Sequence, residues 1–181
     1  MKIINLKKLN FKIVDEILKG KIFIYPTDTI YGIGCNALKE KSVEKIRKIK
    51  KRDRKPFSVI APSKVWIRKN FIYKENILKK LPGKYTIILK YKKCPVSKNV
   101  APGFDSLGIR IPKNPFVKFI RKANVPFITT SVNFSGEKHA AEIKEMPKMV
   151  LKQVDYFIDS GKLTGNPSTI INLKGKEIKR S

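Results

Sequence analysis

The apolar residues of the chain alternate between helical and strand-like spacing. Asn10 precedes apolar positions at helical spacing that end before Gly20, which predicts an amphipathic helix with an N-cap and a glycine stop. The apolar run over residues 21–25 ends at Pro26 and is typical of a buried strand. Continued along the chain, the pattern predicts helices over residues 41–50, 115–120 and 141–151, strands over 57–61, 85–89, 107–111, 126–130 and 154–158, and a closing hairpin of 168–173 with 176–180.

Length and continuity favour a single domain. The chain has 181 residues, enough for one hydrophobic core, and no repeat, low-complexity tract or linker divides it. Helices and strands alternate over most of this length. We therefore predict one domain over residues 1–181, of the α/β class, with a twisted, open, mixed sheet and helices.

The charge of the chain is strongly positive. Lysine and arginine number 41 against 14 Asp and Glu residues, a formal net charge of +27, which should attract polyanions such as RNA. No apolar run approaches the roughly 18 residues of a membrane span, and lysines interrupt any signal core near the start. We expect a protein of the cytoplasm that is not bound to a membrane.

Cysteine and histidine are too few for a zinc site. Cys35 and Cys94 lie far apart in the sequence, and His139 is the only histidine, so a Cys/His set of four ligands cannot be assembled. We therefore expect no zinc and no other metal held by protein side chains. No motif surrounds His139, which we interpret as a surface or packing residue.

Four polar segments follow or precede predicted elements, where loops present side chains and N–H groups to ligands. Residues 25–34 combine hydroxyls with glycine, and residues 50–57 contain five cations. The third segment combines residues 106–112 with the loop 131–133, and its Arg110, inside an apolar strand, needs a carboxylate or phosphate partner from the chain or from a ligand. Residues 159–169 are again small and hydroxyl-bearing. Each segment alone also fits an ordinary turn or a solvated basic surface.

Lys50 and Arg52 are two positions apart, a spacing that cannot place both on one face of a regular helix. Both can face one ligand if the chain has left the helix and become extended. We therefore expect the helix that begins near Lys41 to end by about Lys50, with both cations projecting into a shared site.

In their order along the chain, the polar segments resemble the YrdC-like family, the threonylcarbamoyl-adenylate synthases that supply the threonylcarbamoyl group for tRNA modification next to the anticodon. Six blocks carry the resemblance. They are Tyr25-Pro26-Thr27-Asp28-Thr29-x-Tyr31-Gly32, Lys50-x-Arg52 with Lys55-Pro56-Phe57, Leu81-Pro82-Gly83-x-x-Thr86, Gly108-x-Arg110-x-Pro112, Thr130-Ser131-Val132-Asn133-x-Ser135-Gly136, and Asp159-x-Gly161 with Pro167-Ser168-Thr169.

The resemblance implies an open α/β sheet with a basic concave cavity and a nucleotidyltransferase reaction. L-threonine and bicarbonate would give a carbamate that attacks the α-phosphate of ATP, forming threonylcarbamoyl-AMP and expelling pyrophosphate. Mg²⁺ would be held mainly by phosphates and water, and no organic cofactor is implied. A downstream threonylcarbamoyl-transferase complex would be the partner that modifies tRNA. The resemblance implies that threonine is bound by Thr29, Arg110, Ser131 and Ser168. It implies that the nucleotide is bound by Lys50, Arg52, Lys55, Ser106, Asn133 and Arg180, of which Lys50 and Arg52 are also catalytic.

Two other functions stay open at this point. The charge by itself would support a basic module that binds double-stranded RNA or tRNA without catalysis. The segment between Arg52 and Pro56 is one residue shorter than the commonest family form and is similar to the related domain of hydrogenase-maturation carbamoyltransferases. An enzyme that handles carbamoyl phosphate or a carbamoyl adenylate is therefore a further alternative, which we rank last because the sequence has no zinc-finger or acylphosphatase part of the kind fused in those proteins.

Overall fold

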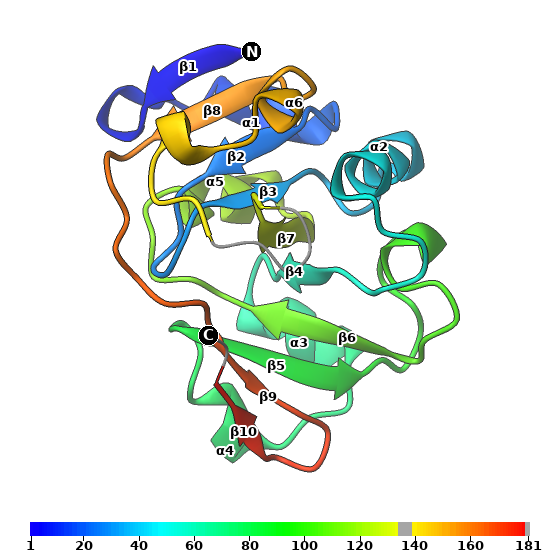
Figure 1. Cartoon of the computed structure of the whole chain (residues 1–181). Helices are drawn as coiled ribbons and strands as arrows, with labels where there is room; N and C mark the ends of the chain where they lie inside the picture. Colours follow the sequence, from blue (N-terminus) through cyan, green and yellow to red (C-terminus); the bar gives the residue numbers. More distant parts are fainter. Residues whose placement is uncertain (134–138, 180–181) are drawn as a thin grey trace.

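The computed structural model describes residues 1–133 and 139–179 and contains a mixed sheet with helices packed on it (Figure 1). Ten strands of the described part pair in the order β1-β8-β2-β3-β7-β4-β6-β5-β9-β10. The pairs β1–β8, β8–β2, β4–β6 and β5–β9 are parallel, and the other neighbouring pairs are antiparallel. The predicted α/β class and mixed sheet are confirmed.

The strands and helices are short. The strands are β1 (Lys2–Asn5), β2 (Phe23–Tyr25), β3 (Gly32–Gly34), β4 (Ser58–Ile60), β5 (Tyr85–Lys90), β6 (Ser106–Arg110), β7 (Phe127–Ser131), β8 (Tyr156–Asp159), β9 (Thr169–Ile171) and β10 (Glu177–Ile178). The helices are α1 (Ile13–Leu18), α2 (Glu40–Lys50), α3 (Lys64–Asn70), α4 (Glu75–Leu78), α5 (Val117–Ala123) and α6 (Lys148–Leu151), with 3₁₀ turns η1 (Leu6–Lys8), η2 (Lys98–Val100) and η3 (Ile143–Glu145). Within these described elements, no helix combines the length and the hydropathy needed to span a bilayer.

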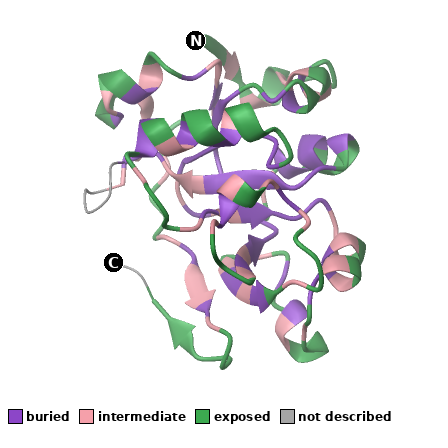
Figure 2. Ribbon diagram, turned by 90° about the vertical axis from the view of Figure 1, so that its right-hand side faces the viewer, coloured by how far each residue is buried: buried purple, intermediate pink, exposed green. Residues whose placement is uncertain are grey.

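Aromatic side chains pack the start of α5 against β2 and β7. The Phe116 ring, just before α5, stacks on Tyr25 of β2 with the ring centroids 4.8 Å apart. Phe127 of β7 meets the same Tyr25 ring edge-on, at 5.5 Å between centroids. Figure 2 shows the buried residues gathered along the strands, with exposed residues on the outer sides of the helices. This packing fixes the C-terminal end of β2 relative to the start of β7.

Most elements predicted from the apolar pattern are present, with ends displaced by a few residues, and the closing hairpin forms between β9 and β10. The prediction of one continuous helix over residues 141–151 is wrong. The chain there forms η3 and then α6, with Pro147 between them. Proline has no N–H to donate and its ring clashes with the preceding turn, so a continuous helix cannot pass this point.

The sequence pattern missed β1, β3, α3 and α4. Strand β3 is Gly32-Ile33-Gly34, a sequence with little strand propensity, and it forms because it pairs with both β2 and β7. A Cβ atom on Gly34 would overlap the carbonyl oxygen of Ile128, so this close backbone approach requires glycine. Helix α3 begins after Ser63, whose Oγ accepts a hydrogen bond from the Trp66 N–H at 3.0 Å.

Candidate functional site

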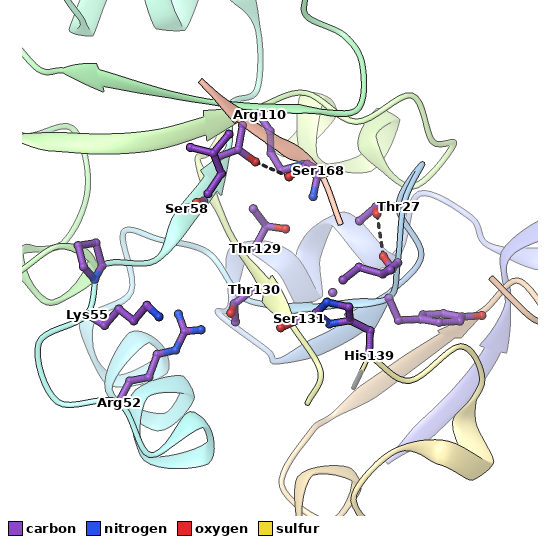
Figure 3. Close-up of a pocket in the computed structure, with 16 residues that line it drawn as sticks. Thr27, Arg52, Lys55, Ser58, Arg110, Thr129, Thr130, Ser131, His139 and Ser168 are labelled. Carbon is purple, nitrogen blue, oxygen red and sulfur yellow. Dashed lines mark hydrogen bonds between the residues drawn. The ribbon is translucent and has the colours of Figure 1, made fainter. Parts of the chain in front are cut away.

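A cavity of about 260 Å³ lies where the segments that follow β2 and α2 approach the C-terminal ends of β6 and β7 (Figure 3). The ends of strands in α/β sheets are the usual place for a ligand, because loops there can present polar groups without disturbing the core. The structure brings five of the predicted site residues into the wall of this cavity: Arg52, Lys55, Arg110, Ser131 and Ser168.

Arg110 is the last residue of β6, and its side chain is only 7% exposed. Its Nη2 lies 3.0 Å from Asp28 Oδ1 and 3.3 Å from Thr29 Oγ1. Burial lowers the pKa of the Arg110 guanidinium, and the neighbouring Asp28 carboxylate opposes that shift. Among the described residues, Nε of Arg110 is buried and has no hydrogen-bond partner. One part of the guanidinium is therefore anchored by Asp28 and Thr29, and the residue also lines the cavity wall.

Asp28 is the internal partner that the sequence left open for Arg110. Its side chain is 6% exposed, and its second oxygen accepts a hydrogen bond from the backbone N–H of Lys113 at 2.9 Å. Both carboxylate oxygens are thus used within the protein. Asp28 holds Arg110 in place and compensates its charge while no substrate is bound.

We expect Asp28→Asn to lower the free energy of unfolding by about 1 to 2 kcal/mol, because a charged acceptor of Arg110 becomes a neutral one of the same shape. Urea unfolding would measure the loss. Glu75→Gln is the matched control, since Glu75 pairs with Arg68 at the exposed surface and its replacement should leave the unfolding midpoint unchanged. Equal effects from the two variants would contradict a structural role for the Asp28–Arg110 pair.

Hydroxyl groups surround this ion pair. Thr27 Oγ1 lies 2.8 Å from Thr29 Oγ1 and donates to the carbonyl of Ile30 at 2.7 Å. Thr29 is buried and does not line the cavity itself, but it contacts Arg110 directly. Ser168 lies 2.7 Å from Thr86 Oγ1, and both residues line the cavity. These bonds fix the hydroxyls beside Arg110 before any ligand arrives.

The loop after α2 carries Arg52 and Lys55. Helix α2 ends at Lys50, as predicted, and Lys51 follows in the left-handed conformation with φ 47°. The Arg47 guanidinium donates to the carbonyls of Asp53 at 2.7 Å and Asn99 at 2.6 Å, so it ties the loop to the segment around η2. The loop is therefore held in a defined position although most of its residues are exposed.

Arg52, like Lys55 of the same loop, lines the cavity (Figure 3). Its guanidinium carbon lies 5.4 Å from the centre of the Phe57 ring, and its buried Nε has no hydrogen-bond partner among the described residues. Burial and then the nearby Arg47 charge lower the pKa of Arg52. A partly buried cation beside another cation is stabilised when an anion binds next to it. The site is therefore suited to a negatively charged ligand.

Lys50 does not line the cavity. Its side chain is buried and its Nζ donates hydrogen bonds to the carbonyl of Ser131, at 2.7 Å, and to the carbonyl of Asn133. The ammonium group thus joins the end of α2 to the segment after β7. Asn133 is likewise buried and lies outside the cavity wall. Of the two cations expected to project into one site, only Arg52 does so here.

Ser106 lines an adjoining cavity of about 530 Å³. The two cavities share Lys55, Pro56, Ser58, Thr86 and Ile170 in their walls, so they lie next to each other. The wall of the second cavity is largely apolar and includes Phe57, Ile88 and Phe104. Arg180, and with it Ser135 and Gly136 of the fifth block, lies outside the described residues.

Three features of the site escaped the sequence analysis. Asp28 stood inside a quoted block, and its acidic side chain two positions after Pro26 was a usable signal for the partner of Arg110. Thr129 and Thr130 line the cavity from the end of β7. His139 also lines it, although the absence of a motif around this residue favoured a packing role. Only the three-dimensional fold places it opposite Arg52 and Arg110.

The fold and the site define an α/β protein with a hollow at the strand ends that is lined by cations and hydroxyls. The family model described as "Telomere recombination", which covers the Sua5, YciO and YrdC proteins, matches residues 15–181. The chain belongs to the Sua5/YciO/YrdC family.

Individual relatives agree with this membership. A Methanocaldococcus jannaschii protein provisionally named threonylcarbamoyl-AMP synthase is 46% identical over 169 residues, 90% of this chain and 79% of the relative. The crystal structure of P. abyssi Sua5 complexed with L-threonine matches 96% of this chain with a TM-score of 0.81 and 26% identity. E. coli YciO matches 99% of this chain and 96% of its own with a TM-score of 0.80, at 23% identity, which supports the fold. The chain spans about half the length of P. abyssi Sua5, 55% of it.

Proposed function

We propose that this protein is an L-threonylcarbamoyladenylate synthase, which forms threonylcarbamoyl-AMP and pyrophosphate from L-threonine, bicarbonate and ATP. The observation that carries the proposal is the buried Arg110, whose Nε has no hydrogen-bond partner among the described residues, in a cavity that Arg52 and Lys55 also line. The name of the M. jannaschii relative and the L-threonine complex of P. abyssi Sua5 support this choice. The product would pass to a threonylcarbamoyl-transferase complex for tRNA modification in the cytoplasm.

Threonine would bind at the Arg110 end of the cavity. A carboxylate beside the Arg110 guanidinium would gain a charge-assisted hydrogen bond in a partly desolvated site. Ser131 and Ser168 line the same cavity and supply hydroxyls for the carboxylate or the amino group. Thr29, which contacts Arg110, would fix the position of the guanidinium.

The nucleotide would extend from Arg52 and Lys55 into the adjoining cavity. Its phosphates would meet these two cations, and its apolar base would lie against Phe57, Ile88 and Phe104. Ser106 lines this part and would contact the nucleotide. Lys50 and Asn133 would act indirectly, because the hydrogen bonds of Lys50 hold the segment after β7 in place. Arg180 lies outside the described residues and stays a proposed nucleotide contact.

The chemistry needs charge stabilisation more than acid–base groups. A carbamate oxygen forms a bond to the α-phosphorus, and the bond from that phosphorus to the pyrophosphate oxygen breaks. Attacking and leaving groups are both anionic, so preorganised cations lower the barrier. The described residues that line the main cavity include no carboxylate, and both oxygens of Asp28 are already bonded. Mg²⁺ would accordingly be held by the phosphates and water.

Pyrophosphate release tests the proposal. We expect release from ATP only when L-threonine and bicarbonate are both present, with carbonate-free buffer and L-valine in place of L-threonine as controls. L-valine replaces the threonine hydroxyl by a methyl group and should support little release. Equal release with and without threonine would overturn the proposal.

The exposed lysines suggest a second property, RNA attraction. Lys7, Lys8, Lys92 and Lys93 are exposed and line none of the cavities. We expect their joint replacement by Gln to weaken tRNA binding and to flatten its salt dependence by a slope of about 3 to 4, since each phosphate contact contributes close to one unit. Turnover at saturating ATP should stay nearly unchanged. A collapse of turnover in the folded variant would instead place these lysines in the catalytic site.

A further inference from the structure

His139 is turned toward the cavity that the proposed reaction uses. The residue is partly exposed, its Nδ1 is buried, and it lines the wall together with Ser131 and Arg110. Figure 3 shows its ring on the same side of the cavity as Ser131, facing the space between the two arginines. It is also the only histidine of the chain.

No other described residue of the main cavity wall can accept a proton near neutral pH. The remaining ionisable side chains there are Arg52, Lys55, Arg110 and Tyr31. Arginine stays protonated, lysine ordinarily titrates near pH ~10.4, and a protonated tyrosine is not a base. Burial raises the pKa of Tyr31 further, and its hydroxyl donates to the carbonyl of Gly161 at 2.8 Å. An unperturbed imidazole titrates near pH ~6.5.

The formation of the carbamate releases a proton. A threonine ammonium and bicarbonate give a carbamate, one water and one proton. The nitrogen lone pair forms the bond to the bicarbonate carbon, and the bond from that carbon to its hydroxyl breaks. Of the two protons that leave the ammonium, one joins the departing hydroxyl as water, and the other needs an acceptor.

We propose that His139 is that acceptor. This inference rests on the proposed function and adds a catalytic base to it. The neutral imidazole takes the proton from the threonine nitrogen, and the partly exposed ring returns it to solvent after each turnover. Among the described residues, the charged groups that line the cavity with it are the cations Arg52, Lys55 and Arg110, and Asp28 is paired with Arg110.

The pH profile of threonine-dependent pyrophosphate release tests the role. For the wild type we expect the rate to fall on acidification with a single ionisation, because a protonated imidazole cannot accept a proton. His139→Gln keeps a polar side chain without a basic nitrogen. It should lower turnover by about a hundredfold, the lower end of what a positioned base supplies, and abolish this acid limb. Threonine affinity, measured by calorimetry, should change by less than about threefold.

A second variant separates a base from a packing residue. Added imidazole should restore part of the turnover of His139→Ala, with the rescue growing as the pH rises through the titration of imidazole. Lys144→Gln, at the exposed surface nearby in sequence, should keep the rate and profile of the wild type. A wild-type rate and acid limb in His139→Gln, or loss of turnover without rescue in His139→Ala, would overturn the inference and leave the proposed function standing. A wild type without threonine-dependent release would overturn both.

Discussion

Replacement of Arg52 by alanine is expected to lower turnover at saturating ATP, threonine and bicarbonate by about a hundredfold or more. Arg52 lines the cavity, and the Phe57 ring and the Arg47-anchored loop hold it in place. During the reaction, negative charge moves from the carbamate and α-phosphate onto the leaving pyrophosphate. A fixed cation stabilises that transition state more than it stabilises the bound substrates. Loss of one preorganised donor typically lowers turnover by about a hundredfold or more.

Steady-state kinetics with nucleotide titration would separate turnover from binding. The Kd of ATP should rise much less than turnover falls. Arg54→Ala is the matched control, because Arg54 is an exposed arginine of the same loop that lines neither cavity. Near-normal turnover of a folded Arg52→Ala protein would contradict the mechanism.

Arg110→Ala is expected to weaken threonine binding by the equivalent of about 2 to 4 kcal/mol, roughly a 30- to 700-fold rise in Kd. The guanidinium is the buried cation of the proposed threonine end, and its Nε has no protein partner among the described residues. Isothermal titration with L-threonine would measure the change.

The alanine variant also leaves Asp28 buried without its cation, so its folding must be followed alongside binding. Arg110→Lys keeps a positive charge beside Asp28 but loses the planar fork, and it should bind threonine with an intermediate affinity. Arg121→Ala, at an exposed position of α5, should bind threonine like the wild type. Unchanged threonine binding in a folded Arg110→Ala or Arg110→Lys protein would contradict the assignment.

The fold was predictable from the sequence where local signals and tertiary contacts agree. Residues 22–25 and 125–128 are continuously apolar, and they contribute the buried strand β2 and the buried start of β7. Strand β3 could not be predicted, because its glycines owe their extended form to pairing on both sides. The helix break at Pro147 has a local signal, the proline itself, although the apolar residues on both sides of it keep helical spacing.

The site was predictable in composition and only partly in geometry. The resemblance placed Arg52, Lys55 and Arg110 in one cavity because their blocks lie at the ends of elements, and the structure brings them together. Burial of Lys50 under the segment after β7 depends on a contact between residues that are about 80 positions apart, which no local pattern encodes. The same limit applies to His139, which reaches the cavity only through the fold.

The most direct measurement of the central claim is mass spectrometry of the product formed from ATP, L-threonine and isotope-labelled bicarbonate. The proposed function predicts an adenylate whose mass includes threonine and the labelled carbon, formed in step with pyrophosphate and absent when threonine is omitted. Rapid quenching would be needed, since a mixed carboxylic–phosphoric anhydride hydrolyses readily. Pyrophosphate release without any labelled threonine adduct of AMP under these conditions would contradict the claim that this cavity joins a threonine carbamate to the nucleotide.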